Sequence, residues 1–486
     1  MSILTSVEEL NLVRSHMTFL LPFGFDQTKE KKIITNLESN GYSYFKIDEA
    51  GKSKDDIFGY GITISGKELE QYFYPYIEHK LFPESEENIG FHRYTASIQK
   101  SHTMLVKGEQ HDFFIRSIDI ILAPFGIAFL ALRVDMAVES ADLSDVLDFI
   151  QHFRALDDNL KESEGAKIVI PEMSQNLSIH DYIFEHLCPF LKKNVLHDNK
   201  LKGHFGSLPY FEDERMFVSS FLITETEATI SDEHLFRIGQ VNGKTPNGTP
   251  FISSTNPDYI RRSLSNSLYD RWAPHLYMIV TDHSYSVISN QPANDLTEEL
   301  SEYMGTHYYN LLLHYFYKMM LLRVAFEYSE IDWKKDEYYV KSLIQLINVF
   351  SSSYYFKEIS TRTQGKELSE MFRNVFLIDS LFNEVSNTLQ ELYKSQENSQ
   401  ADRMNLLLFI LTIFTVISGI YGMNLVISDW ESPSGWKKYS SYTIFEWISL
   451  VTAVSGIGLS AYLIISTIGR ILNRRRRKRN LDIHDQ

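Results

Sequence analysis

A long run without a charged side chain most constrains how this chain can fold. It extends from Met404 to Ser428 and contains no Asp, Glu, Lys, Arg or His. A helix of about 20 apolar residues is long enough to cross the hydrocarbon core of a bilayer, which is roughly 30 Å thick. A second uncharged run follows, from Trp447 to Gly469. The two runs predict two membrane-spanning helices, and the alternative is a pair of buried core helices.

The charges beside these runs predict the orientation of the chain. The second run is followed by Arg470 and by the basic cluster 473–479. Because basic residues flank the cytoplasmic ends of membrane helices, this tail is expected in the cytoplasm. Two spans return the chain to the side on which it started. We therefore expect a multi-pass protein of the inner (cytoplasmic) membrane, with both termini in the cytoplasm.

The remainder of the chain is acidic. The net charge of the whole chain is −16, although residues 401–486 are basic. An acidic body argues against direct binding of nucleic acid, which requires a positive surface. Cys188 is the one cysteine, so neither an intrachain disulfide nor a cysteine metal cage is expected. The first residues also lack the order of a signal peptide.

Residues 1–290 alternate short apolar runs with turn-rich stretches, which favours an α/β (α+β) domain. The segment Ile120–Leu132 is broken by Pro124-Phe125-Gly126, so it is expected to form two buried strands joined by a tight turn. The turn-rich stretch 239–258 is expected to be a long loop or a subdomain joint. Other strands are expected in 43–48, 112–120 and 275–289, and helices in 143–156 and 180–195.

Helical periodicity dominates after residue 295. Segments 299–330 and 337–350 lack proline, and apolar residues recur three and four apart from Leu368 to Leu392. We expect one helix over 366–424, and the alternative is two helices with a break near 396–401. The expected organisation is an enlarged cytosolic domain 1–294, a long-helix stalk 295–403, a first span 404–426, an outer loop 427–444, a second span 445–469 and a basic tail 470–486.

The first uncharged run ends in the motif Tyr421-Gly422-Met423-Asn424. Two C-terminal spans, a long preceding helix and a Gly-Met-Asn motif in this position resemble the CorA-type magnesium and cobalt transporters. The resemblance covers residues 300–470, and it extends to the N-terminal part only by architecture. The chemistry fits Mg²⁺, because this ion retains its waters and a neutral Asn carbonyl accepts hydrogen bonds from them.

The resemblance implies a funnel-shaped homopentamer in a lipid bilayer. Its cytosolic domain would gate a channel for Mg²⁺ or another divalent cation, without a required cofactor and without enzymatic activity. Asn424 would contact the ion through the hydrating waters. The expected pore-lining residues are Asn398, Met404, Leu408, Thr412, Thr415 and Gly419, and the expected acidic residues of the outer mouth are Asp429 and Glu431.

Departures from the family pattern support a second hypothesis. Ile413 stands where the family has a proline, and the segment after Asn424 differs from the family's Met-Pro-Glu. With the enlarged body, these changes suit a divergent CorA-like membrane effector of type III CRISPR antiviral defence, opened by a nucleotide second messenger. A membrane-anchored enzyme is a third hypothesis. The stretch Gly239–Thr245 resembles a phosphate-binding loop but is one residue short, so we set it aside.

Overall fold

The computed structural model describes most of the chain. The described residues are 7–46, 55–59, 62–137, 141–156, 166–170, 176–196, 215–329, 337–424 and part of 443–462. The chain divides into two compact units, Met1–Asn387 and Thr388–Gln486. We call the first unit the body.

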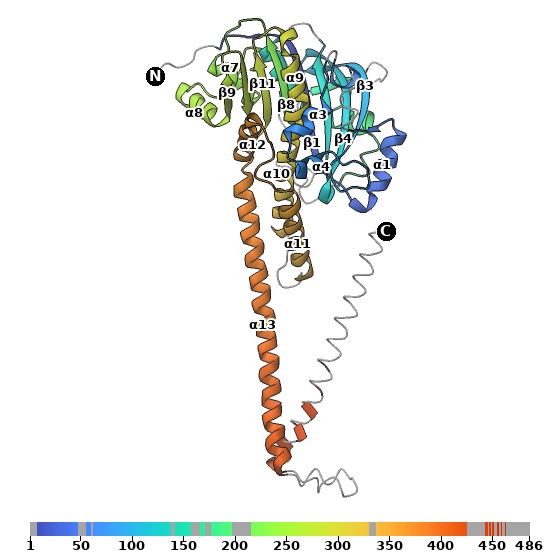
Figure 1. Cartoon of the computed structure of the whole chain (residues 1–486), viewed down its shortest axis with the longest axis vertical. Helices are drawn as coiled ribbons and strands as arrows, with labels where there is room; N and C mark the ends of the chain where they lie inside the picture. Colours follow the sequence, from blue (N-terminus) through green and yellow to red (C-terminus); the bar gives the residue numbers. More distant parts are fainter. Residues whose placement is uncertain are drawn as a thin grey trace. The chain divides into compact units, whose positions relative to one another are not determined.

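The body is built on one sheet of eleven strands (Figure 1). The order along the sheet is β2-β3-β4-β5-β1-β8-β11-β10-β9, and β6 and β7 pair with β1 and β3. All of the pairings are antiparallel except β8 with β11. The strands are β1 Asn11–Gly24, β2 Ser43–Tyr44, β3 His92–Val106, β4 Glu109–Ala123, β5 Ile127–Met136, β6 Ala141–Asp142, β7 Ala166–Val169, β8 Phe217–Thr224, β9 Leu268–Trp272, β10 Leu276–Val280 and β11 Ser284–Ser289.

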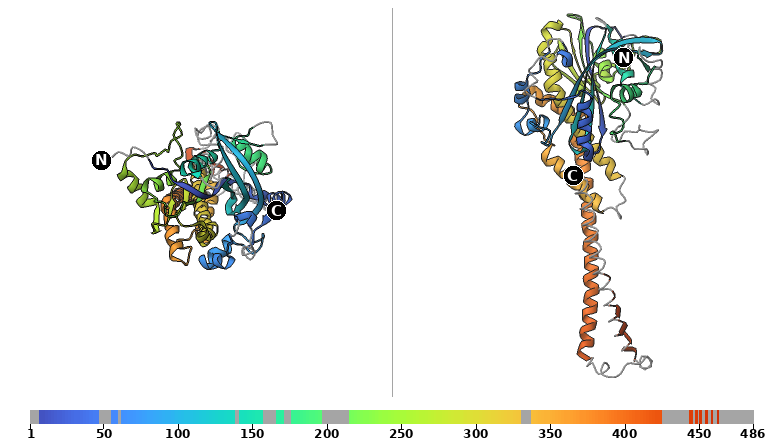
Figure 2. Two further views of the ribbon diagram at one scale, coloured as in Figure 1. Left: turned by 90° about the horizontal axis from the view of Figure 1, so that it is seen from above. Right: turned by 90° about the vertical axis from the view of Figure 1, so that its right-hand side faces the viewer.

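Helices cover both faces of the sheet (Figure 2). The helices of the body before residue 290 are η1 Gln27–Lys29, α1 Glu30–Ser39, α2 Asp55–Phe58, α3 Gly66–Tyr72, α4 Pro75–Leu81, η3 Pro124–Gly126, α5 Leu143–Phe153, α6 Ile179–Asp181, η4 Tyr182–Leu187, α7 Asp232–Gln240 and α8 Pro257–Ser267. The later helices are η5 Ala293–Leu296, α9 Thr297–Glu302, η6 Tyr303–His307, α10 Tyr308–Ser329, α11 Glu337–Ser353, α12 Thr363–Val375 and α13 Ile378–Asn424.

Alternate residues of the strands face the two helical layers. On β1, Phe19 packs against Phe153 of α5 with the ring centroids 4.7 Å apart. On the opposite face, Phe129 of β5 and Phe217 of β8 pack against Tyr315 of α10 at 5.9 and 5.2 Å. Burial on both faces explains why β5 is apolar, without alternation, from Ile127 to Leu132.

Several predicted elements of the body are confirmed. The segment 120–132 forms the end of β4, a short turn at Pro124–Gly126 and the start of β5. The segment 275–289 forms the hairpin of β10 and β11, and 143–156 contains α5. The stretch 239–258 connects α7 to α8, as the glycine and proline content indicated. The body is therefore α/β, as predicted.

The helix predicted over 366–424 is divided, so this prediction is wrong in its first part. Helix α12 ends at Val375 and α13 begins at Ile378. Between them Leu377 has a φ of 53°, in the left-handed region where an α-helix ends. Phe376 packs edge-on against Phe217 of β8, at 5.7 Å between the ring centroids. From Ile378 the backbone is helical to Asn424, so the alternative break near 396–401 is also wrong.

The predicted membrane spans are not supported. Among the described residues, none of the helices combines the length and the apolar character that a bilayer crossing requires. The predictions of two C-terminal transmembrane helices, of membrane-protein class and of a multi-pass position in the inner membrane are therefore wrong. They rested on the absence of charged side chains from 404–428 and 447–469, and much of the second run lies outside the described residues. The predicted loop 427–444, apart from its end, and the tail 470–486 lie outside the described residues.

A buried ionic cluster joins three neighbouring strands beneath α10. Asp119 of β4 is fully buried, and it accepts hydrogen bonds from Arg133 of β5 at 2.6 Å and from Thr95 of β3 at 2.8 Å. Arg93 of β3 also pairs with Asp119, at 3.1 Å. Burial opposes ionisation of this carboxyl, but the two guanidinium groups outweigh burial and hold the pKa of Asp119 below its ordinary value.

A second buried titratable group predicts how stability depends on pH. His314 of α10 is fully buried, and its Nδ1–H donates to the carbonyl of Asn310 at 2.8 Å. Burial lowers the pKa of His314 to about 3. In the unfolded chain the pKa is about 6.5, so between these values only the unfolded state takes up the proton. The contribution of the neutral His314 side chain to the free energy of unfolding is therefore fully present above pH 6.5, and it decreases as the pH falls below that value.

We expect His314→Gln to remove this loss. In the parent chain the free energy of unfolding should fall by about 1.4 kcal/mol per pH unit below pH 6.5 because of this group. Denaturant titrations at pH 7 and pH 5.5 measure the slope. His79→Gln removes an imidazole whose side chain is 66 % exposed, and it is the matched control. An equal slope in the parent and in His314→Gln would contradict the assignment.

Candidate functional site

A pocket of the body lies between one end of the sheet and the helices that follow β11. Its cavity volume is about 420 Å³, within the size range of small-molecule sites. Strands β8, β9, β10 and β11 form one wall, and α9, η6 and the start of α12 form the other. The lining residues are Phe221, Trp272, His275, Leu276, Met278, Val287, Gln291, Glu298, Glu299, Glu302, Tyr303, His307 and Gln364.

The wall formed by the sheet is apolar and aromatic. Phe221, Met278 and Val287 point to the same face of adjacent strands, because their registers place them there. Trp272 lies at the end of β9, where the residue is 39 % exposed. This wall has the character of a surface on which an alkyl chain or a flat ring is bound.

The opposite wall is acidic. Glu298 and Glu302 are four residues apart on α9 and therefore share a side of the helix, and Glu299 lies beside them. One carboxylate oxygen of Glu299, Oε2, is buried without a hydrogen-bond partner. Arg362 lies beside this wall: its Nη1 is 3.8 Å from a carboxylate oxygen of Glu302 and 2.9 Å from one of Glu68.

Burial changes the ionisation of this wall. It raises the pKa of Glu302 above its ordinary value, and repulsion by Glu68 adds to this, while Arg362 opposes both. A raised carboxyl pKa means that negative charge is destabilised here. A bound cation would relieve this destabilisation.

The inner end of the pocket is a fixed hydrogen-bond chain. His307 is buried, its Nε2 lies 3.0 Å from the amide nitrogen of Gln364, and its Nδ1 lies 2.9 Å from the hydroxyl of Tyr285. An amide nitrogen can only donate, so Nε2 accepts and Nδ1 carries the proton. Burial lowers the pKa of His307 to about 4. The imidazole is therefore neutral at pH 7, and both of its nitrogens are engaged.

A second group of side chains has the composition of a metal site. Glu109, His111 and Asp148 offer ligand atoms that all lie within 4.8 Å of one another. They come from the start of β4 and the middle of α5, on a different part of the body from the pocket.

The residues predicted from the Gly-Met-Asn resemblance lie on α13, away from the pocket residues in the chain. Tyr421, Gly422, Met423 and Asn424 form the end of α13, which is consistent with a motif at a helix terminus. Asp429 and Glu431 lie outside the described residues. Their role as an ion filter stays a prediction.

The predicted pore-lining residues are also helical. Asn398, Met404, Leu408, Thr412, Thr415 and Gly419 all belong to α13. The hydroxyls of Thr412 and Thr415 donate to the carbonyls of Leu408 and Leu411, at 2.7 and 2.8 Å, within their own helix. In one chain, Met404 and Leu408 are 60 % and 55 % exposed. Five copies around one axis stay a prediction.

The pocket was missed from the sequence. Its residues extend from Phe221 to Gln364 and share no spacing. The one local signal is the acidic pattern Glu298-Glu299-x-x-Glu302 before an aromatic run, and exposed helix starts often carry such residues because they favour the helix dipole. Comparisons with protein-family models, with curated proteins and with solved structures found no match for the chain.

Proposed function

We propose that the body is a ligand-binding module that takes a small organic cation of the alkylamine class into the pocket between β8–β11 and α9. The observation that carries this proposal is the opposition of three glutamates to an aromatic and apolar wall. An ammonium group has only hydrogen-bond donors and a positive charge, which carboxylates satisfy. The methylene chain of the same molecule would bury apolar surface against the strands.

The aromatic residues strengthen the preference for a cation. Trp272, Phe221 and Tyr303 line the pocket, and the faces of aromatic rings attract cations by roughly 0.5–2 kcal/mol. Glu299, with its unpartnered buried oxygen, supplies an acceptor that the protein itself leaves unused. A cation bound there would satisfy this oxygen and neutralise the wall.

The chemistry of the pocket favours binding over catalysis. Both nitrogens of His307 are already hydrogen-bonded, so this imidazole is not available as a general base. The expectation that the chain is not an enzyme stays a proposal.

Two other ligands follow from the family resemblance. A nucleotide messenger would bring phosphates towards three carboxylates, and the lining residues include neither Lys nor Arg. Hydrated Mg²⁺ suits the carboxylates but makes no use of Trp272 or of the strand wall. The alkylamine uses both walls, and we therefore prefer it; Mg²⁺ is the competitor to be tested.

Calorimetric titration of the full chain with spermidine tests the proposal. We expect saturable binding, and we expect Glu299→Gln to weaken it about tenfold, which corresponds to about 1.4 kcal/mol. Trp272→Ala should weaken it by a similar factor because the ring packs beside the bound chain. Butane-1,4-diol, which has a methylene chain without charge, should not bind.

The acidity of the chain requires a control for nonspecific attraction. Glu87 is exposed and is not one of the lining residues, so Glu87→Gln removes one carboxylate without changing the lining of the pocket. Its affinity for spermidine should stay within about twofold of the parent. Equal losses in Glu87→Gln and Glu299→Gln, or no binding to the parent, would overturn the proposal. The magnesium alternative would be favoured if Mg²⁺ displaced spermidine and if the affinity for Mg²⁺ were unchanged by Trp272→Ala.

A further inference from the structure

Three potential metal ligands meet where β4 begins beside α5. Glu109 and His111 are two residues apart on β4 and so point to the same face of the strand. Asp148 lies on α5, whose Phe149 packs against His111, with the ring centroids 6.3 Å apart. The nearest ligand atoms of the three side chains lie within 4.8 Å of one another.

The imidazole of His111 has an unused nitrogen directed at this cluster. His111 is only 4 % exposed, and its Nε2 is buried without a hydrogen-bond partner. The nearest carboxylate oxygen, Oδ2 of Asp148, is 3.7 Å from this nitrogen. That separation is too long for a hydrogen bond. Two ligands of one tetrahedral ion, at bonds of about 2.1 Å, are themselves about 3.4 Å apart.

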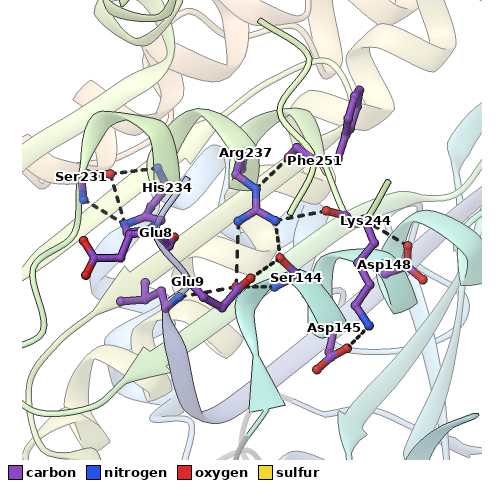
Figure 3. Close-up of polar contacts among 12 residues, drawn as sticks. Glu8, Glu9, Ser144, Asp145, Asp148, Ser231, His234, Arg237, Lys244 and Phe251 are labelled. Carbon is purple, nitrogen blue, oxygen red and sulfur yellow. Dashed lines mark hydrogen bonds and ion pairs between the residues drawn. The ribbon is translucent and has the colours of Figure 1, made fainter. Parts of the chain in front are cut away.

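Asp148 is held in place by its surroundings. Its Oδ1 accepts a hydrogen bond from the backbone N–H of Lys244 at 3.3 Å (Figure 3). Its Oδ2 is also 3.5 Å from Nδ1 of His152, which lies one turn further along α5. Secondary contacts of this kind orient a ligand before the ion arrives.

In this structure the ammonium of Lys244 is the positive charge beside the three potential metal ligands. Nζ of Lys244 is 2.8 Å from Glu109 and 2.6 Å from Asp145 of α5. Figure 3 shows the Lys244 side chain directed at Asp145, and its backbone beside Asp148. Lys244 belongs to the stretch that resembled a phosphate-binding loop, but its ammonium is engaged by carboxylates. An incoming metal ion must therefore compete with this ammonium for Glu109.

We propose that Glu109, His111 and Asp148 bind a divalent transition-metal ion, Zn²⁺ in the first instance, in competition with Lys244. One imidazole and two carboxylates are a ligand set that suits Zn²⁺. Mg²⁺ prefers oxygen ligands and waters, so an imidazole disfavours it. The site is separate from the amine pocket, and it would tie the start of β4 to α5 and to the loop after α7.

Zn²⁺ binding to the full chain, measured by competition with a chromogenic chelator, tests this inference. We expect one tight site. His111→Ala should weaken it by about 100-fold, because even the loss of a supporting contact costs about 10–100-fold in affinity. Glu109 lies at the rim, with its side chain 50 % exposed, so Glu109→Gln should keep the fold and weaken the site about tenfold or more.

Lys244→Met gives a result of opposite sign. Removal of the competing ammonium leaves the carboxylates uncompensated, so we expect tighter binding of Zn²⁺, by about fivefold or more. His79→Ala removes an exposed histidine elsewhere and should leave the tight site unchanged. Absence of tight binding in the parent overturns the inference, as does parent-like affinity in Glu109→Gln or weaker binding in Lys244→Met. These results are independent of the spermidine titration, because the two sites share no residue.

Discussion

Asp119→Asn is expected to destabilise the body by about 3–5 kcal/mol, the cost of leaving buried charges without their partner. The substitution keeps the size of the side chain and removes its charge. Arg93 and Arg133 are each 3 % exposed, and neither guanidinium can release its proton at accessible pH. Both charges would then remain in the layer between the sheet and α10, where Tyr309 accepts from Arg93 at 2.7 Å but carries no charge.

Chemical denaturation of the parent and of Asp119→Asn measures this loss. Asp258→Asn is the matched control, because Asp258 pairs with Arg261 at 3.5 Å while both side chains are about two-thirds exposed. Surface pairs of this kind contribute roughly 0–1 kcal/mol. A loss of less than about 1 kcal/mol in Asp119→Asn would contradict the expected cost.

A triple variant separates charge from shape. Replacement of Asp119, Arg93 and Arg133 together by Leu, Met and Met removes all three charges and fills a similar volume. Buried ion clusters replaced in this way are often close to neutral in stability. We therefore expect the triple variant to be more stable than Asp119→Asn. If it is less stable, the cluster acts through its geometry and not through the balance of its charges.

The elements that local sequence determines were the ones predicted correctly. Pro124 and Gly126 mark the turn between β4 and β5, and the apolar flanks leave only a buried hairpin. The spacing of apolar residues in 143–156 likewise predicts α5. In these segments the turn chemistry and the hydrophobic period agree, so tertiary contacts do not change the outcome.

Elements that depend on distant contacts were not predictable from the chain. The break between α12 and α13 occurs at Phe376 and Leu377, without Gly or Pro. It is stabilised by packing of Phe376 against Phe217 and Tyr315, which are far away in sequence. The π-helical turns η4 and η6 have no sequence signal for the same reason.

The candidate sites also depend on contacts between residues that are distant in the sequence. Glu109 and His111 share one face of a strand by sequence alone, but nothing local places Asp148 beside them. The pocket beside α9 draws on four strands and three helical segments. The Gly-Met-Asn motif was recognisable because it is contiguous, whereas the sites that the body presents are assembled by the fold.

Gly243→Ala is expected to be the most disruptive single-methyl change in the loop after α7. A Cβ at this position would lie 2.6 Å from Cα and 2.8 Å from N of Asp148, which are backbone atoms of α5. A helix backbone cannot move aside as a side-chain tip can, so the loop must separate from α5. We expect a loss of about 2–3 kcal/mol in the free energy of unfolding, typical of an overpacked contact.

Gly248→Ala in the same loop is the informative comparison. Gly248 has a φ of 79°, but a Cβ there meets nothing closer than Glu109 Oε1 at 3.9 Å. Its cost should be only that of a left-handed backbone, about 1 kcal/mol. Denaturation of the two variants therefore separates close approach from backbone conformation. A smaller loss in Gly243→Ala than in Gly248→Ala would show that the loop does not press against α5.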